Sequence, residues 1–178
     1  YIGEYLGEDD LTALAQMATE VFGEIIEPPS LEELYKPSGQ RPQTHSTWLR
    51  DGLATTLLHI AVLSDLVGLK IPGKTPQQFV NEIVRELPGL HSNWRLMASL
   101  QDNLTYLAEA APDSFLGALE HLLEGDANEL RKIFSEGDSF LSPTSPHVGV
   151  LWGLELLAWD PANLLRVSKV LARLALLD

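Results

Sequence analysis

One segment of the chain carries the residue types of a phosphate-binding loop. Residues 68–75 read GLKIPGKT and match the pattern of a glycine, any four residues, Gly-Lys and then Ser or Thr. In such loops a glycine-rich turn points successive backbone N–H groups at phosphate oxygens, while the lysine and the hydroxyl bind the phosphates and Mg²⁺. Nucleotide binding through Gly68, Gly73, Lys74 and Thr75 is therefore one hypothesis for this chain.

The surroundings of this segment differ from those of a phosphate-binding loop. A strand should precede the segment, yet residues 53–67 have the pattern of a long helix. Pro72 lies inside the segment and Pro76 follows it, and each proline removes a backbone N–H donor. We therefore favour a turn in which Thr75 caps the next helix, and we keep nucleotide binding as the alternative.

Histidine and tryptophan recur together at three points of the chain. His-Ser-Thr-Trp at residues 45–48 matches His-Ser-Asn-Trp at residues 91–94, and a looser third copy begins at residue 147. Repeat proteins present equivalent residues on one surface, so a row of these side chains along one edge of the fold would form a binding site. The candidate binding residues are His45, Trp48, His91, Trp94, His147 and Trp152.

These six residues also have a structural interpretation, which we favour. A histidine at the start of a helix can satisfy backbone groups that lack a helical partner. Tryptophan is highly buried on average, so each tryptophan is expected in the core. The functional interpretation requires instead that the side chains reach solvent.

No residue pattern for catalysis or metal binding is present. The five histidines form no His-x3-His or His-Glu-x2-His pattern on one helix. Adjacent carboxylates are expected on polar helix faces, without the burial that shifts the pKa of a catalytic group. We therefore predict no catalytic residue, no metal ion and no cofactor.

The charge of the chain excludes two classes of partner. The net charge is −13, and no cluster of Lys and Arg is present. Binding to a nucleic acid or to an anionic membrane surface depends on such clusters. The sequence has no apolar run that could span a membrane and no cysteine. We expect a cytoplasmic protein whose partner is a protein or another domain of the same chain.

Hydrophobic periodicity predicts an all-α fold. Apolar residues recur at helical spacing, and no stretch of strand length alternates cleanly between apolar and polar residues. The second half of the helix at residues 47–67 is apolar on nearly all sides, which predicts a central, buried helix. The predicted helices cover residues 11–25, 47–67, 76–87, 94–110, 112–124, 127–135, 147–159 and 161–177.

Three prolines at matching positions indicate an internal repeat. Pro76, Pro112 and Pro161 each open a predicted helix, with apolar residues three and four positions later. Because another predicted helix precedes each of them, the repeating unit is a helical hairpin. We expect an irregular HEAT-like array or bundle of about three antiparallel hairpins plus an N-terminal helix. Residues 1–44 would form the N-terminal helix and a proline-rich linker, and residues 45–178 the helical-repeat domain.

Two stretches of the chain resemble a segment of known proteins. Leu151-Trp-Gly-Leu-Glu-Leu-Leu-Ala-Trp-Asp-Pro161, with Leu171-Ala-Arg-Leu-Ala175 after it, resembles a helical segment of very large bacterial proteins with a STAND-type NTPase architecture. Leu107-Ala-Glu-Ala-Ala-Pro112-Asp-Ser-Phe-Leu116 is similar to the same segment. The resemblance covers residues 46–178. It implies the helical-repeat sensor of a protein that also has an effector and a nucleotide-driven switch, and it transfers no catalytic residue.

The ends of the sequence indicate a segment of a longer chain. The first residue is tyrosine rather than methionine, and the last residues stop inside a helical pattern. We therefore expect a non-enzymatic helical-repeat module of a larger bacterial protein, which mediates protein–protein or interdomain contacts.

Overall fold

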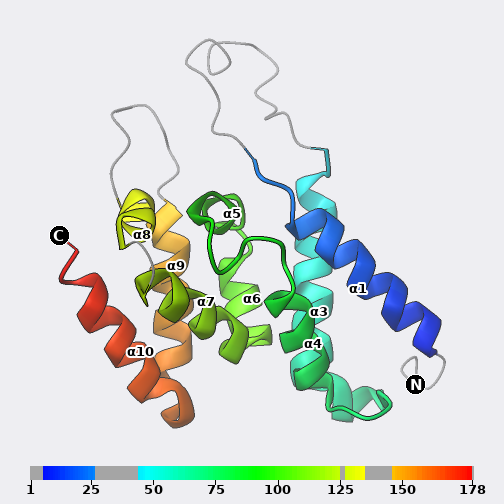
Figure 1. The fold of residues 1–178 in the computed structure, drawn as a ribbon. Coiled ribbons are helices and arrows are strands. Elements are labelled where there is room, and N and C mark those ends of the chain that lie inside the picture. Colours follow the sequence, from blue (N-terminus) through cyan, green and yellow to red (C-terminus); the bar gives the residue numbers. More distant parts are fainter. Residues whose placement is uncertain (1–5, 27–43, 125–126, 135–145, 178) are drawn as a thin grey trace.

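The computed structural model describes residues 6–26, 44–124, 127–134 and 146–177 (Figure 1). These residues form nine α-helices and no strand, which confirms the all-α fold class. The helices are α1 (Glu8–Phe22), α3 (Thr47–Val67), α4 (Pro76–Arg85), α5 (Trp94–Ser99), α6 (Leu104–Ala110), α7 (Pro112–Glu124), α8 (Ala127–Phe134), α9 (Pro146–Ala158) and α10 (Pro161–Leu174).

Three of these helices begin at the prolines that mark the repeat. α4, α7 and α10 start at Pro76, Pro112 and Pro161, as the sequence predicts. Thr75 and Asp160 cap α4 and α10, because their side chains accept hydrogen bonds from backbone N–H groups of the first turn. Those N–H groups have no partner within the helix, so the caps stabilise both helix starts.

The prediction of one helix over residues 94–110 is wrong. The structure divides this stretch into α5 and α6, with a turn at residues 100–103 between them. Asn103 in this turn is buried, and its side-chain amide donates a hydrogen bond to Asp51 Oδ1 of α3 at 2.8 Å. A buried amide needs such a partner, so this long-range contact holds the break in place.

The helices are arranged in two rows. In the first row α6 lies between α3 and α9, and in the second row α7 lies between α4 and α10 (Figure 1). Each helix of the first row also contacts the helix of the second row that follows it, so that α3 contacts α4, α6 contacts α7 and α9 contacts α10. α1 contacts α3 and α4, whereas α5 and α8 contact each other and α9.

The N-terminal helix shares its core with the repeat helices. Leu11, Ala18, Val21 and Phe22 of α1 are buried in the same hydrophobic cluster as residues of both rows. α1 is therefore part of the same folded body. Most of the predicted proline-rich linker, residues 27–43, lies outside the described residues.

A buried arginine fastens the end of α1 to α3 and α5. The guanidinium of Arg50 on α3 donates to the carbonyl oxygen of Val21 at 2.7 Å and to that of Ser99 at 3.2 Å. Carbonyl groups in the last turn of a helix lack helical donors, and the guanidinium satisfies them here. Burial lowers the pKa of Arg50 and the nearby carboxylate of Glu24 opposes this, but a guanidinium remains charged in a protein.

The prediction that the second half of α3 is buried on all sides is wrong. Leu57 and Ile60 are buried, whereas Val62 and Leu66 are 52 % and 72 % exposed. The neighbours of α3 are α1, α4 and α6, and together they cover one side of the helix. The apolar residues on the other side of α3 therefore face solvent.

α9 lies very close to its neighbours at two glycines. A Cβ atom at Gly149 would lie 2.5 Å from the carbonyl oxygen of Gln101, in the turn before α6. A Cβ atom at Gly153 would lie 2.9 Å from the ring of Phe115 on α7. Both distances are shorter than van der Waals contact, so α9 takes its place in the first row because these residues have no side chain.

Gly149→Ala is expected to lower the free energy of unfolding by about 1–3 kcal/mol, because the added methyl group overpacks a contact with backbone. Gly52→Ala is the matched control, since Gly52 lies in α3 with no atom within 4 Å of an added Cβ. Alanine in a helix is favoured over glycine by about 1 kcal/mol, so the control should gain stability. Urea unfolding measures both variants, and equal changes would contradict the close contact.

An arginine on α10 joins this helix to α7. Arg166 Nε and Nη2 donate to the two carboxylate oxygens of Glu120 at 2.9 and 2.8 Å, and Nη1 donates to Asp113 Oδ1 at 2.8 Å. The hydrogen bonds from Arg166 lower the pKa of Glu120, and they outweigh the opposing effect of burial. The end of the second row is thus held by a charge-assisted, bidentate contact.

The contact between Arg166 and Glu120 should make stability depend on pH. Because the pKa of Glu120 is lower in the folded protein than in the unfolded chain, the contact stabilises the fold above the ordinary glutamate pKa. This stabilisation is lost as the pH falls through the lowered value. Arg166→Met should therefore be less stable than the wild type at pH 7, with the difference shrinking in acid. Urea unfolding over a pH series tests this, and a difference that stays constant in acid would count against it.

Candidate functional site

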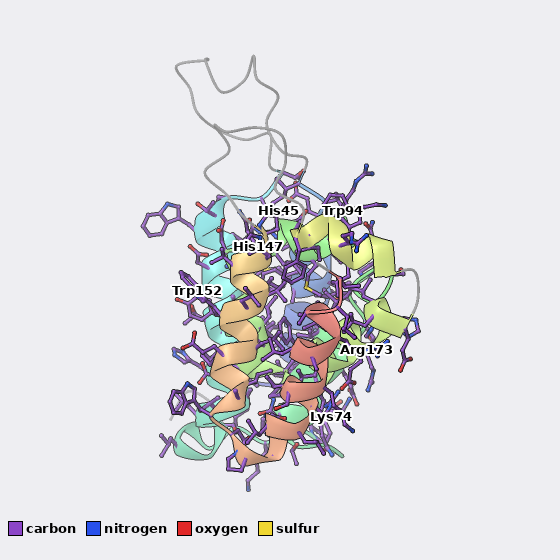
Figure 2. The ribbon with its side chains drawn as sticks, turned by 90° about the vertical axis from the view of Figure 1, so that its left-hand side faces the viewer. His45, Lys74, Trp94, His147, Trp152 and Arg173 are labelled. Atoms are coloured by element: carbon purple, nitrogen blue, oxygen red, sulfur yellow. The ribbon has the colours of Figure 1, made fainter. Side chains whose placement is uncertain are left out.

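The six predicted histidines and tryptophans occupy unlike environments. His45, Trp94 and His147 lie toward one end of the molecule, whereas Trp152 projects from the side of α9 that faces away from α10 (Figure 2). Equivalent sequence positions therefore do not make equivalent contacts.

His45 is held by two carboxylates of the N-terminal region. Its Nδ1 lies 3.2 Å from Glu24 Oε2, and its Nε2 lies 3.7 Å from Glu20 Oε1. Burial raises the pKa of Glu24, but hydrogen bonds from Thr44 and His45 more than offset this, so the pKa lies below its ordinary value. The position of His45 is consistent with a structural role, because it ties the start of α3 to the end of α1.

The other two histidines contact different partners. His91 lies between α4 and α5, where its Nε2 donates to the carbonyl oxygen of Arg85 at 3.2 Å, and its ring meets that of His121 edge-on at 6.1 Å. His147 lies in the first turn of α9, and its ring stacks on Phe134 of α8 with the ring centres 5.7 Å apart. Both histidines are partly buried.

The three tryptophans divide into one packed and two exposed side chains. Trp94 is partly buried against the hydrophobic core. Trp48 in the first turn of α3 is 85 % exposed, and Trp152 on α9 is 61 % exposed. The expectation that each tryptophan is a core residue is therefore wrong for Trp48 and Trp152, because the helices that carry them have neighbours on one side only.

The exposed tryptophans belong to a larger apolar surface on the first row. On α3, Trp48, Val62 and Leu66 lie on one stripe, opposite the buried residues of the same helix. On α6, which is flanked by α3 and α9 and covered by α7, the exposed aromatic residue is Tyr106. We call Trp48, Val62, Leu66, Tyr106 and Trp152 the outer face. Helical periodicity indicated apolar helices here, but it did not show which side of each helix would be left uncovered.

The exposed charges on the helices of the first row are negative. Asp51, Asp102 and Glu155 are exposed on or beside the helices of the first row, and Glu109 is half-buried on α6. Arg50 is the only Lys or Arg in α3, α6 and α9, and it is buried. The first row therefore combines exposed aromatic side chains with an acidic border.

The segment that resembles a phosphate-binding loop joins two helices. α3 ends at Val67, and Gly68 closes it in the left-handed conformation (φ 72°), with its N–H donating to the carbonyl of Ser64. A helix thus occupies the place where a phosphate-binding loop has a strand. Thr75 Oγ1 accepts a hydrogen bond from the N–H of Gln78 at 3.1 Å, and the Gln78 side chain accepts one from the N–H of Thr75 at 2.9 Å. This reciprocal cap engages the hydroxyl that a nucleotide site would use for Mg²⁺.

The remaining residues of this segment lie beside α4. Lys74 forms an ion pair with Glu82 of α4. Gly73 has a φ of 73°, a left-handed conformation that glycine adopts without strain. Both residues line one end of a groove between α4 and α7.

In the part of the chain that the structure describes, no three His, Asp or Glu residues are grouped so that they could hold a metal ion. None of the described helices is both long and apolar enough to cross a membrane. Comparison with known proteins adds no assignment, because no family model, no curated protein and no solved structure matches the chain.

Thr75→Ala is expected to lower the free energy of unfolding by about 1 kcal/mol, since it removes the cap of α4, and Thr75→Ser should restore most of this. Lys74→Met should cost less than about 1 kcal/mol, because the ion pair with Glu82 is partly exposed. Urea unfolding with and without Mg-ATP measures these changes. An effect of Thr75→Ala that appears only when Mg-ATP is present would contradict the capping role.

Proposed function

We propose that this chain is a non-enzymatic helical-repeat module that binds a protein, or another domain of its own chain, through the outer face. The array would be HEAT-like, with α3–α4, α6–α7 and α9–α10 as its three hairpins. Two rows of helices that contact their neighbours in sequence order support this interpretation.

The observation that carries the proposal is the exposure of large apolar side chains on the first row. Trp48 is 85 % exposed, Leu66 72 % and Trp152 61 %. Tryptophan is enriched among the residues that dominate protein–protein binding energy, and contiguous exposed apolar surface marks interaction sites. Covering these side chains would release the water around them, which is favourable.

The acidic border indicates the chemistry of the partner. Asp51, Asp102 and Glu155 are exposed beside the outer face, and none of the helices of the first row carries an exposed Lys or Arg. A partner with an apolar stripe flanked by basic side chains would complement this surface in both charge and hydrophobicity. The resemblance to the repeat segment of STAND-type proteins would make a switch domain of the same chain one such partner.

The proposal is tested with a synthetic amphipathic helix that has a leucine stripe flanked by lysines. Titration calorimetry of this peptide against the wild type should show saturable binding. Trp48→Ala and Trp152→Ala should each weaken it by about tenfold or more, since exposed aromatic anchors typically contribute at least that much. Both side chains are mostly exposed, so neither substitution opens a cavity in the core.

Leu165→Ala is the matched control, because Leu165 is 66 % exposed on α10 in the second row. It should leave the peptide affinity within about twofold of the wild type, because Leu165 lies outside the proposed interface. A loss for Leu165→Ala equal to that of the tryptophan variants, or unchanged binding by both tryptophan variants, would overturn the assignment of the outer face.

A further inference from the structure

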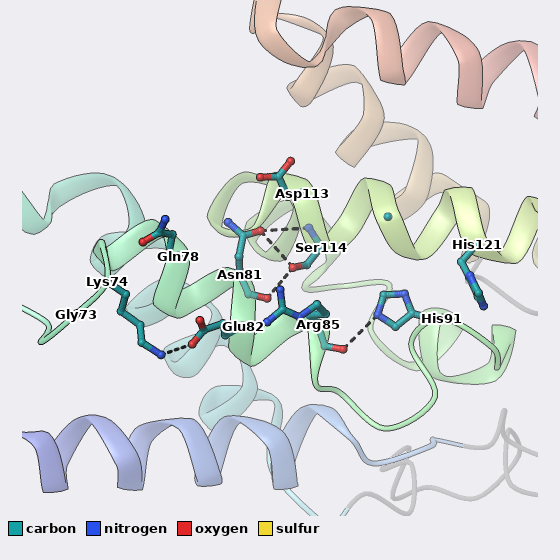
Figure 3. Close-up of a pocket in the computed structure, with 11 residues that line it drawn as sticks. Gly73, Lys74, Gln78, Asn81, Glu82, Arg85, His91, Asp113, Ser114 and His121 are labelled. Carbon is teal, nitrogen blue, oxygen red and sulfur yellow. Dashed lines mark hydrogen bonds and ion pairs between the residues drawn. The ribbon is translucent and has the colours of Figure 1, made fainter.

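A polar groove lies between α4 and α7, on the second row of helices, and no part of the proposed function uses it. Its volume is about 700 Å³, within the range of small-molecule sites. Figure 3 shows Lys74 and Glu82 toward one end, Asn81 and Ser114 in the middle, and the rings of His91 and His121 toward the other end. The lining is completed by Gly73, Gln78, Arg85, Asp113 and Gly117.

The two carboxylates that line the groove are already paired with cations. Glu82 forms an ion pair with Lys74, and Asp113 accepts a hydrogen bond from Arg166 at 2.8 Å. Glu82 is balanced by Lys74, whereas Asp113 shares Arg166 with Glu120. The groove differs in this respect from the acidic border of the outer face.

One cation in the groove has no such partner. The side chain of Arg85 is exposed, and it forms no ion pair or hydrogen bond with any described residue. A guanidinium presents paired N–H donors that fit the oxygens of a carboxylate or phosphate group. Although the net charge of the protein is −13, the unpaired positive charge of Arg85 would attract an anion to the groove.

Two imidazoles also line the groove, and one of them adds a further donor. His91 Nε2 must carry its hydrogen, because it donates to a carbonyl oxygen, the backbone oxygen of Arg85. This contact fixes the ring of His91 next to the backbone of Arg85 and edge-on to His121. His121 makes no hydrogen bond with the described residues, so its ring nitrogens are available to a ligand.

The middle of the groove is rigid and open at the same time. The hydroxyl of Ser114 donates to the carbonyl oxygen of Asn81 at 2.6 Å, and the N–H of Ser114 donates to Asn81 Oδ1 at 3.1 Å, which fastens α7 to α4. Gly117, one turn further along α7, has no atom within 4 Å of the place where a Cβ would lie. A side chain added there would therefore begin in open space within the groove.

We propose that this groove binds a small anion that carries a phosphate or carboxylate group, with Arg85 as the principal contact and His91 and His121 beside it. The proposal rests on the groove alone and is independent of the outer face. It also differs from the nucleotide hypothesis, because Lys74 is engaged by Glu82 and the anion is bound by Arg85.

Two probes test the proposal, inorganic phosphate and succinate. They distinguish a phosphate ligand from a carboxylate ligand. Each is titrated into ¹⁵N-labelled protein at constant ionic strength, with chloride as the balancing anion, and amide shifts are followed by NMR. At least one probe should give saturable shifts at residues of the groove. Saturation by phosphate alone assigns a phosphate ligand, and saturation by succinate alone assigns a carboxylate.

Three variants decide whether the groove is responsible. Arg85→Gln should weaken binding by about tenfold or more, the usual effect of losing a hydrogen bond to a charged group. Gly117→Leu should block binding while keeping the fold, because leucine is favoured over glycine in a helix and its Cβ meets nothing. Lys169→Gln removes one positive charge from the exposed face of α10 and should leave the affinity within about twofold.

Three results would overturn the proposal. One is that neither probe gives saturable shifts in the groove of the wild type. The second is that Arg85→Gln and Gly117→Leu bind as the wild type does. The third is that Lys169→Gln loses as much affinity as Arg85→Gln. Amide spectra of each variant without ligand show whether the variant is folded, so that a loss of binding is not mistaken for unfolding.

Discussion

The contact of α9 with α6 determines whether the first row exists as one surface. At Gly149 the backbone of α9 comes so close to the carbonyl of Gln101 that a methyl group would not fit, and at Gly153 it meets Phe115. A larger separation would break the contact between α6, which carries Tyr106, and α9, which carries Trp152. The placement of the outer face thus depends on two positions that have no side chain.

The same arrangement leaves the fold with two kinds of free surface. The first row exposes apolar side chains beside acidic ones. These apolar side chains do not stabilise the isolated chain, and covering them with a partner would be favourable. The second row has a polar groove in which the carboxylates are paired and Arg85 is not. These surfaces lie on different helices and differ in chemistry, so they suit different partners: a protein on one and a small anion on the other.

Local sequence signals predicted the helices but not what surrounds them. The starts at Pro76 and Pro161 follow from proline at the first helical position and a capping residue before it, all within one turn of chain. The break before α6 depends on the hydrogen bond between Asn103 and Asp51, which are far apart in sequence. For the same reason the sequence identified Trp152 as a candidate without showing that it is exposed, and it missed Tyr106 entirely.

The most direct test of the outer face is hydroxyl-radical footprinting of the protein with and without the lysine-flanked amphipathic helix. Oxidation at Trp48, Tyr106 and Trp152, which come from three different helices, should fall together when the peptide is bound, while oxidation at Leu164 and Leu165 of α10 stays unchanged. Protection that appears on α10 and leaves the three aromatic residues as reactive as before would contradict the account.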